Sequence, residues 1–243
     1  MLLNKDIWNT ADYNNFINYL HTLSDTKYKM FHSKLLKDNN IEVIGVKTPI
    51  LKDIAKEISS GNYIDFIKQI KHNYYEEDVI YGLILGYLKI PFTEIITLLN
   101  DFTPYINNWA TNDIVCANMK IFKKEQAKGL IVIKEYLNDT NYWIVRFGLV
   151  LLLDYYINDK YIDDVLFICK NLKHQEYYVL MAIAWLISIC YIKYPNKTIN
   201  LLKNGYLDDF TLNKSIQKII ESKRINKVDK NKLRKLKRSN SEK

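Results

Sequence analysis

The chain has 243 residues, of which 48% are hydrophobic and 26% charged, the balance of a globular protein with a sizeable core. Only 7 Gly and 4 Pro occur, which argues against long irregular loops and favours helices with short connections. The net charge of +8 is uneven, because residues 213–243 carry 12 Lys/Arg against 3 Asp/Glu while the first 212 residues carry 23 against 24. Charge alone therefore leaves nucleic acid, anionic lipid and a simply solvated end as alternatives for this segment.

The sequence also indicates the cellular compartment in which the protein is expected. The first fifteen residues lack the apolar core of a signal peptide, and the most apolar stretch, 177–191, is too short and too mixed to span a bilayer. The three cysteines are far apart and form neither a disulfide framework nor a zinc motif: Cys116, Cys169 and Cys190. We expect a cytoplasmic protein without membrane association.

Helical periodicity begins near the N-terminus and continues through the chain. Apolar residues recur at i, i+3, i+4 and i+7 in three segments, 13–20, 51–58 and 63–70. Thr48 and Pro49 are suited to be the N-cap and first turn of the second segment. Val79–Leu88 is nearly all apolar, as in a helix buried on most sides, and Pro91 opens the next helix. Further helices are predicted at 124–137, 142–157, 161–172, 176–193, 196–203 and 211–223.

This pattern predicts an all-α fold, either a compact bundle or a solenoid of stacked helix pairs. Helix pairs follow one another every 35–40 residues or so, in the range of HEAT-type repeats. We therefore expect a HEAT-like helical-repeat solenoid, curved, with a concave binding face. No linker is visible before residue 225, so a single domain over 1–224 and a basic C-terminal tail over 225–243 are expected.

The sequence lacks the motifs of several common enzyme classes. The sequence contains no Gly-rich phosphate loop, no HExxH and no GxSxG. The histidines share no helical face and are interpreted as surface or satisfied side chains: His21, His32, His72 and His174. The adjacent acids Glu76–Glu77 and Asp163–Asp164 point different ways on a helix and are interpreted as solvated faces. Neither a metal nor a cofactor is expected.

Two short segments place polar side chains against their local pattern. Trp109 and Asp113 are four residues apart and would share one helical face, where a carboxylate beside an indole can act strongly on a cationic neighbour. The alternative is a core Trp and a helix-capping Asp. Arg146 interrupts an apolar helix, so it snorkels, pairs with a buried acid or reaches a phosphate.

The third such segment is an aromatic stripe. Tyr177, Met181 and Trp185 fall on one helical face, a pattern more typical of a core than of a binding site. None of these three segments decides the function when taken alone.

Together, however, the segments resemble the AlkD family of DNA alkylation repair proteins, which are HEAT-like DNA glycosylases. The resemblance runs along most of the chain, through segments 31–35, 45–52, 108–113, 145–147, 177–185, 213–222 and 224–225. It implies that Asp113 stabilises the positive sugar and positions water, and that Trp109 and Trp185 contact the lesion's deoxyribose. It further implies that Arg146 holds the neighbouring phosphate.

The resemblance also implies a DNA-backbone contact in the segment that holds Thr48 and Lys52, where Lys replaces an Arg of the family. We expect Lys47 and Lys52 to lie with Arg146 on the DNA-binding face. The implied partner is double-stranded DNA containing alkylated bases, bound by a monomer.

The implied activity is that of a monofunctional DNA-3-methyladenine/7-alkylguanine glycosylase that acts without base flipping. N7- and N3-alkylpurines are cationic and leave readily, so a preorganised carboxylate near an oxocarbenium-like sugar is the main requirement. Indole faces add cation–π stabilisation of about 0.5–2 kcal/mol. Two alternatives remain: a catalytically inactive HEAT-like module that binds damaged or branched DNA, and a helical scaffold for another protein.

Overall fold

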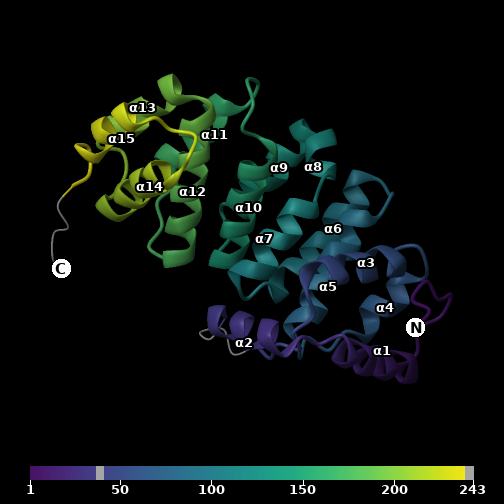
Figure 1. The fold of residues 1–243 in the computed structure, drawn as a ribbon. Helices are drawn as coiled ribbons and strands as arrows, with labels where there is room; N and C mark the ends of the chain where they lie inside the picture. Colours follow the sequence, from purple (N-terminus) through teal and green to yellow (C-terminus); the bar gives the residue numbers. More distant parts are fainter. Residues whose placement is uncertain (37–40, 239–243) are drawn as a thin grey trace. The chain divides into compact units, whose positions relative to one another are not determined.

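The computed structural model describes residues 1–36 and 41–238. These residues form α-helices joined by short connections and one 3-10 turn, and no strand occurs among them beyond a single bridge between Glu42 and Tyr74 (Figure 1). The prediction of an all-α fold is confirmed. No helix within the described ranges is long and apolar enough to cross a membrane.

The chain divides into two compact units, Met1–Ile121 and Phe122–Lys243. Helix α8 (Ile121–Lys124) begins at the boundary. Unit 1 contains α1 (Thr10–Thr22), α2 (Thr26–Leu35), α3 (Thr48–Ile58), α4 (Tyr63–Gln69), α5 (Tyr75–Tyr87), α6 (Phe92–Phe102), the turn η2 (Thr103–Tyr105) and α7 (Trp109–Asn118). Unit 2 contains α9 (Gln126–Tyr136), α10 (Tyr142–Tyr155), α11 (Ile162–Asn171), α12 (Tyr177–Lys193), α13 (Pro195–Lys203), α14 (Asp209–Glu221) and α15 (Lys227–Arg234).

Within each unit, three alternate α-helices form a series in which each packs on the next one. In unit 1, α3 packs on α5 and α5 packs on α7, while in unit 2 α10 packs on α12 and α12 on α14. We call these six the central helices. Five further helices pack on them: α6 on α5, α9 on α10, α11 and α13 on α12, and α15 on α14. This layering is the one expected of stacked helix pairs, in agreement with a helical-repeat architecture.

The apolar periodicity identified the buried faces correctly in two helices. In α1 the buried residues are Tyr13, Phe16 and Leu20, and in α3 they are Leu51, Ile54, Ala55 and Ile58. In α4 only Phe66 is buried, and the helix ends at Gln69, one residue before the predicted Ile70. The predicted cap of α3 is wrong by one position: Lys47 is the N-cap, and Thr48 is the first helical residue.

The described part of the basic C-terminal segment is folded against α14 within unit 2. Residues 227–234 form α15, which packs on α14 and buries Leu233. After α15, the Arg238 guanidinium donates to the Leu207 carbonyl at 3.1 Å and to Asp209 at 2.8 Å. A frayed end is therefore excluded for residues 225–238, although most of their side chains are exposed. Residues 239–243, the remainder of the expected tail, lie outside the described residues.

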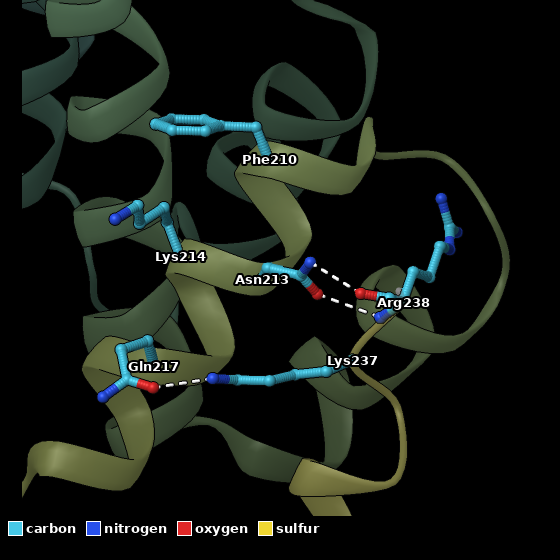
Figure 2. A pocket seen from close by; sticks show the side chains of 6 residues that line it. All are labelled: Phe210, Asn213, Lys214, Gln217, Lys237 and Arg238. Atoms are coloured by element: carbon cyan, nitrogen blue, oxygen red, sulfur yellow. Dashed lines mark hydrogen bonds between the residues drawn. The ribbon is translucent and has the colours of Figure 1, made fainter. Parts of the chain in front are cut away.

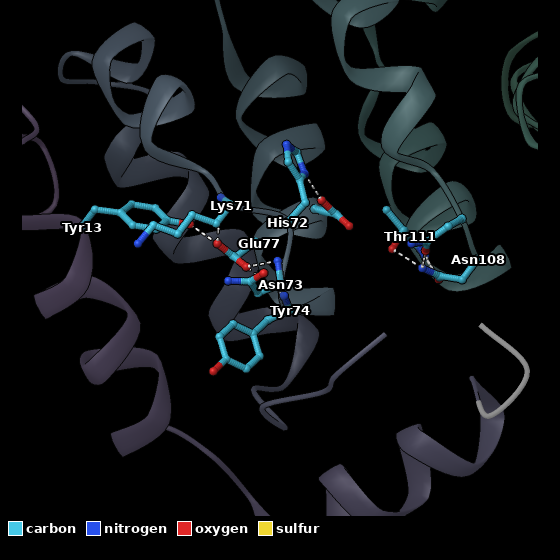
Figure 3. A network of polar contacts seen from close by, with 10 residues as sticks. Tyr13, Lys71, His72, Asn73, Tyr74, Glu77, Asn108 and Thr111 are labelled. Carbon is cyan, nitrogen blue, oxygen red and sulfur yellow. Dashed lines mark hydrogen bonds and ion pairs between the residues drawn. The ribbon is translucent and has the colours of Figure 1, made fainter. Parts of the chain in front are cut away.

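The acids at the start of α5 correct one prediction. Glu76 and Glu77 were expected on a solvated face but are fully buried, and Asp163–Asp164 are exposed as expected. Glu77 accepts hydrogen bonds from the Tyr13 hydroxyl and from the backbone N–H groups of Asn73 and Tyr74 at 2.7 and 2.8 Å (Figure 3). Periodicity missed this because a carboxylate can be buried when backbone donors replace water.

Glu76 organises the connection that leads into α3. Its carboxylate accepts from three successive backbone N–H groups, those of Ile44 at 2.9 Å, Gly45 at 2.7 Å and Val46 at 3.1 Å. Gly45 has φ +104°, a left-handed conformation that a side chain would strain, and this lets the three donors converge. Burial raises the pKa of Glu76 above its ordinary value, although the three donors oppose that shift.

The stack of α5 on α7 depends on Gly82. A Cβ built at Gly82 would overlap the Val115 side chain of α7 and lie 2.8 Å from Phe102 Cζ. We expect Gly82→Ala to lower the free energy of unfolding by about 1–3 kcal/mol, the range for overpacking a core. Gly148→Ala is the matched control, because Gly148 lies in the middle of α10 and the atoms nearest to an added Cβ, from Tyr136 and Leu137, are 3.3 Å away. Equal denaturation midpoints for the two variants would contradict this account.

His32 predicts a pH dependence of stability. It is buried between the rings of Tyr28 and Tyr75, its Nε2 has no hydrogen-bond partner among the described residues, and burial lowers its pKa below the ordinary 6.5. The unfolded chain therefore takes up a proton below pH 6.5 that the folded chain resists, and stability falls on acidification through that window.

The measurement is urea denaturation of wild type and His32→Phe at about pH 5 and about pH 7.5. The wild type should lose stability relative to the variant at the lower pH, since Phe keeps the ring packing and cannot titrate. The buried Glu76 and Asp78 have raised pKa values and act in the opposite direction, but both proteins share them. Parallel profiles would contradict the assignment to His32.

Candidate functional site

Trp109 and Asp113 lie one turn apart on α7. The helix begins with Asn108 as N-cap, whose side chain accepts from the Thr111 N–H at 2.8 Å and donates to the Thr111 hydroxyl at 3.0 Å (Figure 3). Asp113 is the fifth residue of the helix and does not cap it, so the capping alternative is excluded. Trp109 packs partly against the apolar core of unit 1, and both side chains remain half-buried.

Trp109 and Asp113 therefore lie on one face of α7 at the edge of the core. A half-buried carboxylate is partly shielded from water, and an indole one turn away can add to that shielding. Lower exposure to water strengthens the interaction of a carboxylate with a positive charge. The pair can therefore stabilise a cation that approaches α7.

The segment that enters α3 carries three of the predicted DNA-binding residues. The Lys47 ammonium forms an ion pair with Asp25 at 2.7 Å, and this contact holds the pKa of Asp25 below its ordinary value. The Thr48 hydroxyl lies 3.4 Å from that of Tyr28. Lys52 is exposed one turn further along α3. Lys52 is accessible to a phosphate. Lys47, in contrast, would have to contact the phosphate together with Asp25, or leave Asp25 for the phosphate.

Arg146 is anchored inside unit 2. Arg146 is only 5% exposed, and its Nη1 donates to the backbone carbonyl of Tyr178 at 2.8 Å. Snorkelling to solvent is therefore excluded. A guanidinium has five N–H donors in a rigid fork. The carbonyl contact orients that fork at the beginning of α12, the helix that carries Trp185.

Trp185 is half-buried on α12 and lines a pocket of about 320 Å³ between α12 and the end of α14. Its polar lining residues are Ser188, Lys218, Glu221, Ser222 and Arg224. The stripe to which Trp185 belongs is not a pure core face, since Tyr177 is 52% exposed. An indole beside two cations and one carboxylate, a lining with net positive charge, suits an anionic group with an attached ring.

The sequence interpretation missed the polar lining of this pocket. Lys218 and Arg224 lie in segments that carry the family resemblance, but no role was assigned to them. Nothing in their spacing relates them to Trp185, which is more than thirty residues earlier in the chain. Only the packing of α14 on α12 brings the three side chains to one pocket.

The predicted site residues are divided between the units. Unit 1 holds Trp109 and Asp113 on α7 and the DNA-backbone segment at the start of α3, and unit 2 holds Arg146 on α10 and Trp185 on α12. All of these helices are central helices. A single site formed by the four residues remains a prediction. Among the described residues, no three His, Cys, Asp or Glu side chains are grouped to hold a metal ion.

The fold and these side chains define a helical-repeat protein whose central helices present an indole–carboxylate pair and an aromatic pocket with cations. Residues 16–219 match the family model of the DNA alkylation repair enzymes, and the chain belongs to that family. The comparison with curated proteins found no match. Family membership supports a role in DNA alkylation repair and an interaction with DNA.

Proposed function

We propose that the protein is a monofunctional DNA glycosylase that removes cationic N7- and N3-alkylated purines from duplex DNA. The C1′–N bond breaks, and its electron pair neutralises the departing base. Water then adds to C1′ and gives up a proton, which leaves the free alkylpurine and an abasic site. No general acid is needed, because the leaving base already carries the positive charge.

The observation that carries this proposal is the pairing of Trp109 and Asp113 on a helix of a DNA alkylation repair enzyme. The side chains lie on one face of α7 and are half-buried, and the N-cap of this helix is Asn108. In the proposed mechanism Asp113 faces the oxocarbenium-like sugar and orients the attacking water. Trp109 excludes bulk water and contributes cation–π stabilisation.

The residues of unit 2 would hold the damaged strand. Arg146 would contact the phosphate beside the lesion, with its guanidinium oriented by the Tyr178 carbonyl. Trp185 would contact the deoxyribose. Contacts to the sugar and the backbone do not require a pocket for a flipped base. The charge of the lesion and the lability of its glycosidic bond would then determine which bases are released.

The direct test is incubation of the purified protein with duplex DNA that contains 7-methylguanine, followed by chromatography of released bases. We expect free 7-methylguanine and an abasic strand that remains uncut until alkali or heat is applied. DNA binding without base release would instead establish a non-catalytic module for damaged DNA. Release accompanied by strand cleavage would contradict the monofunctional mechanism.

A further inference from the structure

A second cationic pocket lies in unit 2, between α14 and the segment that follows α15. Its volume is about 670 Å³, and its lining residues are Phe210, Asn213, Lys214, Gln217, Lys237 and Arg238 (Figure 2). Three of the six are cations, two are amides and one is aromatic. No carboxylate lines it. That composition is suited to an anion.

Hydrogen bonds to α14 hold the cationic wall in place. The Asn213 side chain donates to the Arg238 carbonyl at 2.9 Å and accepts from the Arg238 N–H at 3.0 Å, and the Lys237 ammonium donates to Gln217 Oε1 at 2.6 Å (Figure 2). The last described residues are thus tied to α14. The cations are positioned before any ligand arrives, which reduces the entropic cost of binding.

The charge of this pocket is only partly offset. Arg238 is paired with Asp209 at 2.8 Å. Lys237 bonds a neutral amide, and the Lys214 ammonium lies 5.6 Å from the centre of the Phe210 ring. Within residues 1–36 and 41–238, no ion pair joins Lys214 or Lys237 to a carboxylate. Two ammonium groups therefore remain for an external anion.

The surroundings indicate which anion. Phe210 packs edge-on against the exposed Tyr177 at 5.9 Å, so an aromatic surface borders the cations. Lys214 and Lys218 are one turn apart on α14, and Lys218 lines the Trp185 pocket. Cations interleaved with aromatic rings are typical of surfaces that follow a nucleic-acid strand. Cationic lining on α14 thus extends from the Trp185 pocket to this one.

We propose that this C-terminal pocket binds phosphodiester groups of the DNA strand, outside the lesion contacts, through Lys214 and Lys237. The inference rests on the DNA substrate of the proposed function. It assigns a role to the basic C-terminal segment, namely affinity for undamaged and damaged duplex alike. Phosphate contacts carry no base information, so they would increase the affinity for DNA without selecting the lesion.

The test is fluorescence anisotropy of an undamaged duplex over a range of salt concentrations, with wild type and the double variant Lys214→Gln, Lys237→Gln. Each lost phosphate contact lowers the slope of log affinity against log salt by about 0.9, so we expect a decrease of about 1.8 and roughly tenfold or greater weakening. Lys160→Gln, Lys203→Gln removes two exposed lysines elsewhere in unit 2 and is the matched control. Lys214→Arg, Lys237→Arg should keep the wild-type slope.

The possible outcomes distinguish failure of the pocket proposal from failure of the glycosylase proposal. An unchanged slope in the double variant, or an equal decrease in the control, overturns the pocket and leaves the glycosylase proposal intact if wild type still releases 7-methylguanine. A decreased slope in a protein that releases no base supports the pocket and rejects the glycosylase. No duplex binding by wild type rejects both. Loss of binding to anionic vesicles with an unchanged DNA slope also overturns the proposal. Circular dichroism melting verifies that the variants are folded.

Discussion

Asp113→Asn is expected to lower the rate of 7-methylguanine release by at least about 10²–10³-fold while duplex binding stays near the wild-type level. Asn has the shape of Asp and keeps an oxygen for water, but it lacks the negative charge. In the proposed reaction that charge interacts far more strongly with the positive sugar of the transition state than with the ground state, so its loss affects rate and not affinity.

The measurement is single-turnover base release beside anisotropy titration of the same duplex. Asp101→Asn is the control, since Asp101 is an exposed acid of α6 in the same unit. It should behave as wild type. If Asp113→Asn retained full activity, the catalytic role of Asp113 would be rejected. If it lost binding and activity together, Asp113 would be a structural or binding residue instead.

Glu76→Ala is expected to lower the free energy of unfolding by at least about 3 kcal/mol, because it leaves three buried N–H groups without an acceptor. The donors belong to Ile44, Gly45 and Val46, directly before Lys47 and Thr48. The connection into α3 should therefore loosen, and duplex affinity should fall with stability. Glu76→Gln, which keeps one oxygen, should be intermediate.

The control for Glu76 is Glu94→Ala. Glu94 also lies in the first turn of its helix, α6, but it is exposed and should contribute less than about 1 kcal/mol through the helix dipole. Urea denaturation of the three variants gives the order. Similar losses for Glu76→Ala and Glu94→Ala would show that charge near a helix start, and not the three backbone contacts, explains the effect.

Much of the helical framework was predictable because it depends on local spacing. The i, i+3, i+4 and i+7 pattern identified the buried faces of α1 and α3, and the predicted helices of unit 2 begin and end within a few residues of those observed. The buried Glu76 and Glu77 were not predictable in this way. Apart from the Tyr13 hydroxyl, their partners named here are backbone donors in preceding segments, and backbone donors leave no mark in the side-chain pattern.

In the candidate site, too, local spacing predicted some features, and contacts between distant segments determined the others. The spacing of Trp109 and Asp113 placed them on one face, and the structure agrees, because both are on one helix. The spacing could not show that Asn108 holds the cap and leaves Asp113 without that role. It also could not relate Lys218 and Arg224 to Trp185, or Lys237 to Gln217, since these pairs belong to different segments.

The helical class, the helices that carry Arg146 and Trp185, and the excess of positive charge near the C-terminus were all predictable from the sequence. The helix that carries Trp109 and Asp113 was not among the predicted helices. Contacts between distant segments, visible only in the folded chain, place this charge against α14 and hold Arg146 at a backbone carbonyl. The physical reason is the range of each interaction. Periodicity and composition reflect neighbours within a few turns, whereas burial and pocket lining depend on contacts between helices far apart in the chain.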